Sequence, residues 1–194
     1  MEERQSMPTW DATQQRVLDA ADGLLSQRGV RGLTVAELAR RSGLSRPTIY
    51  RSWNDADDVV RSALLRRIVS ILADLTPPPP GRAGVVDDIL RFIGRFRSDA
   101  VFARLLEDEP EVFTRYTLQR VGASQRMILA WLTDAVSAAQ HDGSARRGDA
   151  RQISVMLLMI AQSAVLSHGT VADLIDEDAW HSELRAALDG HLRP

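Results

Sequence analysis

The 194-residue sequence contains neither cysteine nor lysine, and each absence limits what the protein can do. Without cysteine, the chain has no disulfide, no thiolate nucleophile and no cysteine-ligated metal. All 24 residues in the combined lysine and arginine count are therefore arginine. This bias is typical of GC-rich coding sequences and predicts a bacterial source.

The sequence also lacks a segment that would target or span a membrane. Its first residues, Met1–Arg4, are acidic, and the apolar core of a signal peptide is missing. The longest strongly apolar run, Val155–Ala161, is far shorter than the roughly 20 residues that cross a bilayer. We therefore expect a cytoplasmic protein.

Charge of one sign does not dominate the composition. The net charge is −2 and 44% of the residues are apolar. These values suit a folded protein of one large or two small domains and exclude collagen-like and disordered chains. A nearly neutral chain has no overall field that draws it to DNA, so such an affinity requires a local basic patch.

Helical periodicity covers most of the chain, and we find no alternating pattern of useful length that would predict a strand. The predicted fold is all-α with about nine helices, three of them in an N-terminal unit that precedes a helical bundle. The clearest linker is the run Pro77–Pro80. Counted with their caps, the first three predicted helices begin at residues 11, 34 and 45. The other six are predicted at 55–75, 85–98, 100–107, 111–140, 150–167 (ended by Gly169) and 177–189.

Two of the predicted helices are short and meet at a tight turn. Thr34 and Glu37 form a capping box, and Gly43 supplies the left-handed residue that ends the first helix. Ser45 caps the second helix, whose first turn tolerates Pro47. Such a pair is typical of a helix-turn-helix motif, here about residues 34–53, although an ordinary helical corner could explain any single match. The packing positions of the motif hold small or apolar residues: Leu38, Ala39, Leu44 and Ile49.

The same segment carries the local basic patch. Residues 28–53 contain six arginines and one acid, Glu37, which gives a net charge of +5. Arginine binds guanine edges and phosphates, and hydroxyl groups bind phosphate oxygens. For Arg40 and Arg41 alone, a solvated charged face is an equally simple interpretation. The predicted DNA-binding residues are Thr34, Ser45, Arg46, Pro47, Thr48, Tyr50 and Arg51.

The string from Gly32 to Trp53, GLTVAELARRSGLSRPTIYRSW, resembles the DNA-binding domain of the TetR family of transcriptional regulators. The likeness spans about residues 11–71. It implies a homodimeric repressor of double-stranded operator DNA, with a DNA-binding domain at 11–71. Residues 72–194 would then form the domain that binds a small effector and dimerises.

The sequence departs from this family at the end of the motif. Ser52 stands where a second aromatic residue is common, and Ala56 stands where a lysine is common. Three acids at the start of the next helix, at 55, 57 and 58, would repel a nearby phosphate. We therefore expect Arg46, Tyr50 and Arg51 to carry more of the contact with the DNA backbone than is usual.

The helix predicted at 150–167 is apolar nearly all round, so it must be covered on more than one side. A second copy of the chain would provide this cover through a two-fold four-helix interface with the last helix. The alternative is a central helix buried within a monomer. The predicted interface residues are Leu157, Ile160, Ala164, Trp180, Leu184 and Leu188.

All four phenylalanines lie between residues 92 and 113. Clustered aromatic residues usually form ordinary core, but they also line cavities for apolar ligands. The functional interpretation is an effector cavity with Gln162 as its polar anchor. Its predicted lining is Phe92, Phe96, Phe102, Phe113, Tyr116, Met127, Trp131, Met156 and Met159. The acidic run at 107–111 is interpreted as a solvated helix junction, or alternatively as a selector for a cation.

The sequence offers little that would support catalysis. The four histidines, at 141, 168, 181 and 191, lack metal-ligand spacing, and neither a phosphate-binding loop nor a nucleophile elbow is present. We expect no enzyme, metal or cofactor. The predicted function is a DNA-binding regulator, a repressor that a small hydrophobic effector releases from a palindromic operator. Alternatives are a DNA-binding protein of this fold that a partner controls or that needs no ligand, and a helical enzyme or carrier that keeps the motif as a scaffold.

Overall fold

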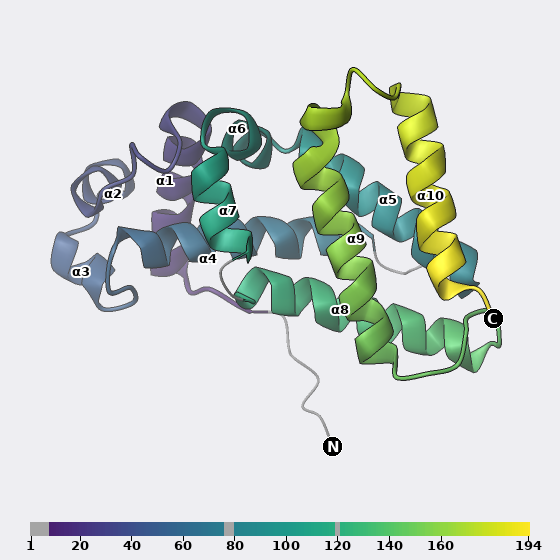
Figure 1. Ribbon diagram of the computed structural model, residues 1–194. Coiled ribbons are helices and arrows are strands. Elements are labelled where there is room, and N and C mark those ends of the chain that lie inside the picture. The colour runs from purple at the N-terminus through teal and green to yellow at the C-terminus, as the bar shows by residue number, and fades with distance from the viewer. Residues whose placement is uncertain (1–7, 76–79, 119–120) are drawn as a thin grey trace. The chain divides into compact units, whose positions relative to one another are not determined.

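A computed structural model describes residues 8–75, 80–118 and 121–194, and these residues form ten helices and no strand (Figure 1). The prediction of an all-α fold is confirmed. The chain separates into two compact units: unit 1 is Met1–Ser70 with Ser98–Gln125, and unit 2 is Ile71–Arg97 with Arg126–Pro194. Three prolines of the predicted linker, residues 77–79, lie outside the described residues.

Unit 1 contains the predicted helix-turn-helix and two later helices. In it α1 packs against α2 and α6, α2 against α3, and α6 against α7. Fully buried leucine, isoleucine and valine side chains hold these helices together, including Leu18, Leu38 and Ile49. Its helices are α1 (Ala12–Arg28), α2 (Val35–Ser42), α3 (Arg46–Tyr50), most of α4 (Ala56–Ala73), α6 (Ala100–Asp108) and α7 (Pro110–Leu118).

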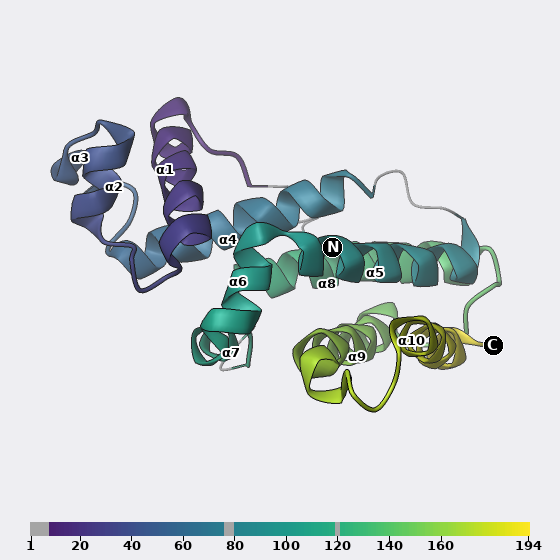
Figure 2. The same ribbon diagram turned by 90° about the horizontal axis from the view of Figure 1, so that it is seen from above.

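Unit 2 is built from α5 (Gly81–Ser98, up to Arg97), α8 (Ala123–His141, from Arg126), α9 (Ala150–Val171) and α10 (Glu177–Leu192). Helices α9 and α10 lie side by side and run in opposite directions (Figures 1 and 2). A continuous apolar core joins the four helices, and its fully buried members include Val136, Leu157 and Leu188.

A polar cluster joins three helices of unit 2. His168 of α9 lies between Arg97 of α5, whose Nη2 is 3.0 Å from Nδ1, and Glu177 of α10, whose Oε2 is 2.7 Å from Nε2. Arg97 also donates to Glu177 Oε1 at 2.8 Å and lies over the ring of Trp180. These hydrogen bonds hold the pKa of the Glu177 carboxyl below its usual range. The cluster fixes the end of α9 against the start of α10.

Several predicted helix boundaries are wrong. The segment predicted as one helix over 111–140 is two helices, α7 and α8, because Gly122 lies between them and donates its N–H to the Gln125 side chain at 2.9 Å. Gly169 does not end α9, which continues to Val171. A glycine in a helix costs only about 1 kcal/mol relative to alanine, so it does not by itself stop a helix.

Candidate DNA-binding site

Local capping interactions build the helix-turn-helix. The Thr34 side chain accepts a hydrogen bond from the N–H of Glu37 at 3.2 Å, which starts α2. Gly43 ends α2 with a φ of 67°, in the left-handed region that glycine adopts at little cost. Ser45 then accepts from the N–H of Thr48 at 3.3 Å and starts α3, with Pro47 in its first turn. Thr34, Gly43, Ser45 and Pro47 are therefore located where the sequence predicts them. The predicted capping box is only half formed, because the Glu37 carboxylate binds Arg40 and Arg28.

Buried side chains fix α3 against the rest of unit 1. Ile49 is 1% exposed, and Trp53 is buried while its indole N–H donates to the Ser62 hydroxyl of α4 at 2.9 Å. Since Ile49 and Trp53 lie four residues apart, they anchor one side of the motif and leave the other side to solvent.

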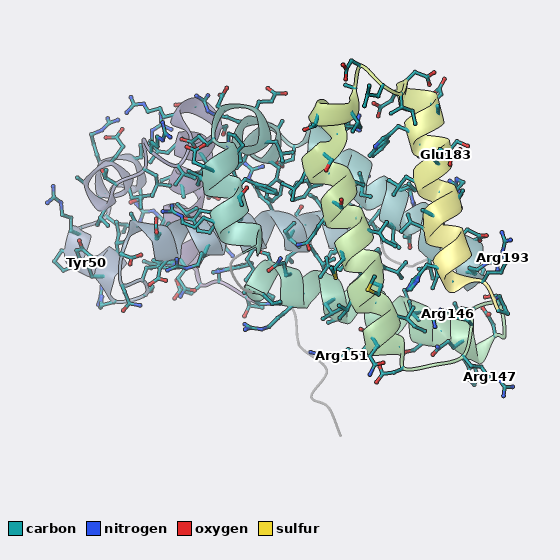
Figure 3. The ribbon with its side chains drawn as sticks, viewed as in Figure 1. Tyr50, Arg146, Arg147, Arg151, Glu183 and Arg193 are labelled. Carbon is teal, nitrogen blue, oxygen red and sulfur yellow. The ribbon has the colours of Figure 1, made fainter. Side chains whose placement is uncertain are left out.

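The outer side of α3 carries the predicted contacts. Ser45, Arg46, Pro47, Tyr50 and Arg51 are exposed, and so is Thr34 at the start of α2. Tyr50 is 54% exposed and projects from α3 into solvent (Figure 3). The seventh predicted residue, Thr48, is half-buried and accepts a hydrogen bond from Arg51 at 3.4 Å. The structure thus brings these residues together on one surface.

Acidic side chains neutralise some of the arginines in the basic patch. The Glu37 carboxylate binds Arg40 at 2.6 Å and Arg28 at 3.3 Å, and its pKa is lowered, chiefly by the hydrogen bond from Arg40. Arg31 pairs with Glu111 of α7. Within the described part of the chain, Arg46 and Arg51 form no ion pair. Arg41 of α2 binds the neutral Gln27 side chain, so the positive charge of the patch that no acid neutralises lies at Arg41, Arg46 and Arg51.

Two of the acids at the start of α4 accept hydrogen bonds from other side chains. The Asp58 carboxylate binds Arg61 and the Asn54 side chain, and these hydrogen bonds lower its pKa. Asp57 accepts a hydrogen bond from the Tyr116 hydroxyl of α7 at 3.2 Å. Burial, with the nearby Asp57 charge, raises the pKa of Tyr116 to about 12. Tyr116, a predicted cavity residue, thus contacts the start of α4.

The junction of α6 and α7 holds the end of α1. The Glu109 carboxylate, 5% exposed, accepts hydrogen bonds from the backbone N–H of Val30 at 2.7 Å and of Arg31 at 3.3 Å. Gly29, whose φ is 68°, lies so close that a Cβ there would stand 2.7 Å from this carboxylate. The interpretation of 107–111 as a solvated junction is therefore wrong for Glu109, whose oxygens accept hydrogen bonds from two backbone amides that follow α1.

A chain of ion pairs joins α1, α4 and α6 within unit 1. Asp99 caps α6 by accepting from the N–H of Val101 at 2.9 Å, and its other oxygen binds Arg67 of α4 at 2.5 Å. Arg67 also binds Asp22 of α1 at 3.0 Å, and Asp22 in turn binds Arg66 at 2.5 Å. Sequence reasoning missed this network because its members are far apart in the chain and each alone is typical of a helix surface.

The predicted cavity residues are distributed over both units. Phe92, Phe96 and Trp131 gather in unit 2, with ring centroids 6.1 Å apart for the phenylalanines and 6.3 Å for Phe92 and Trp131. Met127 is buried and Gln162 half-buried in the same unit. Phe102 and Phe113 are buried in unit 1. Met159 is 54% exposed on α9.

One face of α9 is apolar and uncovered in the single chain. Val155, Met156 and Met159 are 38%, 44% and 54% exposed. Among the described residues, α9 is the one helix with the length and composition of a membrane span, and 22% of that apolar window is buried. Of the predicted interface residues, Leu157, Leu184 and Leu188 are buried in the core of unit 2, whereas Ile160, Ala164 and Trp180 are half-buried.

Comparison with known sequences agrees with this architecture. The family model described as bacterial regulatory proteins, tetR family, matches residues 17–63. An uncharacterised HTH-type transcriptional regulator of Mycobacterium tuberculosis is 36% identical over 177 residues, which cover 91% of this chain and 93% of the relative. The uncharacterised HTH-type regulator YdeS of Bacillus subtilis is 30% identical over 87 residues, 45% of this chain and 42% of that protein.

Solved structures share the fold at low identity. The transcriptional repressor QsdR of R. erythropolis, from the TetR family, superposes with a TM-score of 0.71 at 18% identity, over 95% of this chain and 96% of that chain. FadR of Bacillus subtilis in complex with stearoyl-CoA superposes with a TM-score of 0.57 at 16% identity, over 92% and 99% of the two chains.

Proposed function

Because the chain belongs to the TetR family of helix-turn-helix transcriptional regulators, we propose that it is a dimeric repressor that a small hydrophobic effector releases from a palindromic operator. The protein is a DNA-binding regulator and not an enzyme. A regulator of operator DNA acts inside the cell, and we propose that this one is cytoplasmic. The domain boundary near residue 71 is part of this proposal.

The observation that carries the proposal is the charge on α3. Arg46 and Arg51 are exposed without ion-pair partners among the described residues, while the neighbouring Arg28 and Arg40 share Glu37. A helix-turn-helix places its second helix in the major groove, where arginine forks bind guanine edges or phosphates. In this proposal Thr34, Ser45, Thr48 and Tyr50 contact the phosphates, and Pro47 packs beside them.

The uncovered face of α9 supports dimerisation. A second copy of the chain would cover Val155, Met156 and Met159 and place two α3 helices on successive half-sites, about 34 Å apart. A membrane would also cover an apolar face. We favour the second copy because Ile153, Leu157 and Leu158 already pack the opposite side of α9 into the core of unit 2.

The aromatic cluster of unit 2 supports an apolar effector. Phe92, Phe96 and Trp131 form a continuous ring surface that can bind an apolar or aromatic ligand. A protein of the same fold, FadR of Bacillus subtilis, is described in complex with stearoyl-CoA, whose acyl chain is apolar. Such a ligand shifts operator affinity only by binding the free and DNA-bound conformations unequally.

The test starts from a random pool of DNA duplexes, from which the purified protein selects its preferred sequences. We expect an inverted repeat, bound far more tightly than a scrambled duplex at the same salt concentration. Selection of no common sequence would contradict DNA-binding regulation at a palindrome. An effector at 100 times its dissociation constant should stabilise the protein by about 2.7 kcal/mol and release the operator. A protein that binds the repeat but responds to no compound would instead favour control by a partner.

A further inference from the structure

Asp88 of α5 is a fully buried carboxyl group with an unused oxygen. Its exposed fraction is 0%, and its Oδ1 binds the guanidinium of Arg91, one turn further along the helix. Its Oδ2 is buried and has no hydrogen-bond partner among the described residues. A buried acceptor without a partner costs about 1–3 kcal/mol, so a group at this position calls for an explanation.

Asp88 lies on the face of α5 that carries part of an aromatic cluster. Phe92 follows Asp88 by four residues, so the two side chains lie on the same face of α5. Phe92 in turn contacts Phe96 and Trp131. The unused carboxyl oxygen therefore belongs to a residue one helical turn from an aromatic cluster, and a single hydrogen bond to it would fix the orientation of an apolar ligand.

Arg91 contacts both this carboxyl group and a surface groove. Its side chain is 50% exposed and, while it pairs with Asp88, it also lines a groove of about 420 Å³ between α5 and α10. Asp87, Leu90, His181 and Arg185 form the rest of the groove. A ligand in this groove would therefore lie against the side chain that binds Asp88 Oδ1.

We propose that Asp88 is the polar anchor of the effector site, and that the effector is an uncharged, largely aromatic molecule whose hydroxyl or N–H group donates a hydrogen bond to Asp88 Oδ2. The inference rests on the proposed function, because it names the ligand class of the same regulator. The charges already present at Asp88 favour a ligand whose donor group is neutral. Arg91 already neutralises Asp88, and a second cation would add an unpaired positive charge to a buried site. The sequence-based choice of anchor, Gln162, is replaced by Asp88 in this proposal.

Matched probes test the proposal. We would measure the binding of 1-naphthol, of 1-methoxynaphthalene and of 1-naphthylmethylammonium to the full chain by calorimetry. The three share one ring system and differ in a neutral donor, no donor and a cationic donor. We expect 1-naphthol to bind at least tenfold more tightly than either of the others.

Variants assign that preference to Asp88. In Asp88→Leu the preference for the hydroxyl should fall below twofold, whereas in Asp134→Asn, at an exposed position of α8 outside the groove, it should be unchanged. If Asp88→Leu does not fold by circular dichroism, Asp88→Ala replaces it with the same expectation. Equal binding of 1-naphthol and its methyl ether, binding of neither, tighter binding of the ammonium, or a preference that survives in Asp88→Leu would overturn the proposal.

Operator binding is measured in the same samples and separates this inference from the proposed function. A protein that binds its operator and is released by 1-methoxynaphthalene as readily as by 1-naphthol would refute the role of Asp88 alone. A protein that shows the Asp88-dependent preference but no operator would refute only the repressor.

Discussion

The carboxylate of Glu109 accepts a hydrogen bond from the backbone N–H of Val30 at 2.7 Å, across 79 positions of the chain. The two residues join the α6–α7 junction to the turn that leads from α1 into the helix-turn-helix. Arg104 of α6 strengthens this attachment by donating to the carbonyl of Gln27, in the last turn of α1, at 3.2 Å. The turn before α2 is thus held by side chains that lie outside the motif.

Replacement of Glu109 should destabilise the protein substantially. Glu109→Ala leaves the buried N–H of Val30 and the part-buried N–H of Arg31 without this partner, so we expect the free energy of unfolding to fall by about 1–3 kcal/mol. Urea denaturation followed by circular dichroism measures the change. The control is Glu111→Ala, which removes only an exposed ion pair with Arg31 and should cost about 0–1 kcal/mol. Equal costs for the two variants would show that the Glu109 contact does not stabilise this turn.

The arginines of α3 should dominate operator binding. Arg46→Ala and Arg51→Ala should each weaken it by about 5- to 150-fold, which corresponds to about 1–3 kcal/mol for a base contact. If an arginine binds phosphate instead, the slope of log affinity against log salt concentration should decrease by about 1. Fluorescence anisotropy across a salt series measures both quantities. The matched control, Arg147→Ala, removes an exposed arginine from unit 2 (Figure 3).

The double variant Tyr50→Phe with Arg51→Ala tests whether Tyr50 and Arg51 supply the contacts with the DNA backbone that Ser52 and Ala56 cannot make. We expect it to bind the operator more weakly than the wild type. Both positions lack the aromatic and lysine side chains that the family resemblance leads us to expect, so the remaining contacts should carry more of the affinity. Wild-type affinity together with a wild-type salt slope in this variant would refute the assignment of backbone contacts to Tyr50 and Arg51.

A charge on the exposed face of α9 should separate the dimer. Met159→Arg places a cation on an apolar surface that is 54% exposed in the single chain, and burial of that cation against a second copy would be costly. Analytical ultracentrifugation at micromolar concentration should show a species of 21.5 kDa for the variant and of twice that mass for the wild type. Ala138→Arg, on an exposed position of α8, should leave the dimer intact. A wild-type protein that sediments only at 21.5 kDa would exclude the dimer.

Asp88 should make stability depend on pH in an unusual direction. Burial, the largest cause, raises the pKa of this carboxyl above its ordinary value of 3.8, although the hydrogen bond from Arg91 opposes the shift. The folded state therefore binds the proton more tightly than the unfolded state, and stability falls as the pH rises from 3.8 through the folded pKa. Asp88→Asn should therefore raise the melting temperature at pH 7, and this gain should shrink as the pH falls towards 3.8. A variant less stable than wild type at pH 7 would contradict this cost of ionisation.

The sequence predicts the helix-turn-helix well because its signals are local. The caps at Thr34 and Ser45 and the left-handed Gly43 each act within about four residues, so spacing alone reveals them. The predicted helix at 111–140 fails for the same reason. Its periodicity continues through Gly122, whose N–H donates to the Gln125 side chain at the start of α8, and the sequence pattern does not reveal that hydrogen bond.

The remaining features depend on contacts between residues that are distant in the chain. The acidic run at 107–111 gives no sign that Glu109 is buried while Glu111 stays exposed, because only the approach of Val30 distinguishes them. Aromatic residues that cluster in the sequence, from Phe92 to Phe113, belong to two units of the structure. Helical spacing does identify the apolar character of α9, but not which side of it remains uncovered.

The shortness of α3 limits how much information one subunit can read. Its five residues, Arg46–Tyr50, span roughly 7.5 Å, about the rise of two base-pair steps. A subunit that discriminates about three base pairs would find a match by chance roughly once in 64 positions of random DNA. Two-fold symmetry doubles the number of base pairs that are read. The chance of a match at one position then falls to about one in 4,000, because the chances for the two half-sites multiply. The rarity of a binding site in the genome would therefore be set by the second copy of α3 and by the spacing between the two copies.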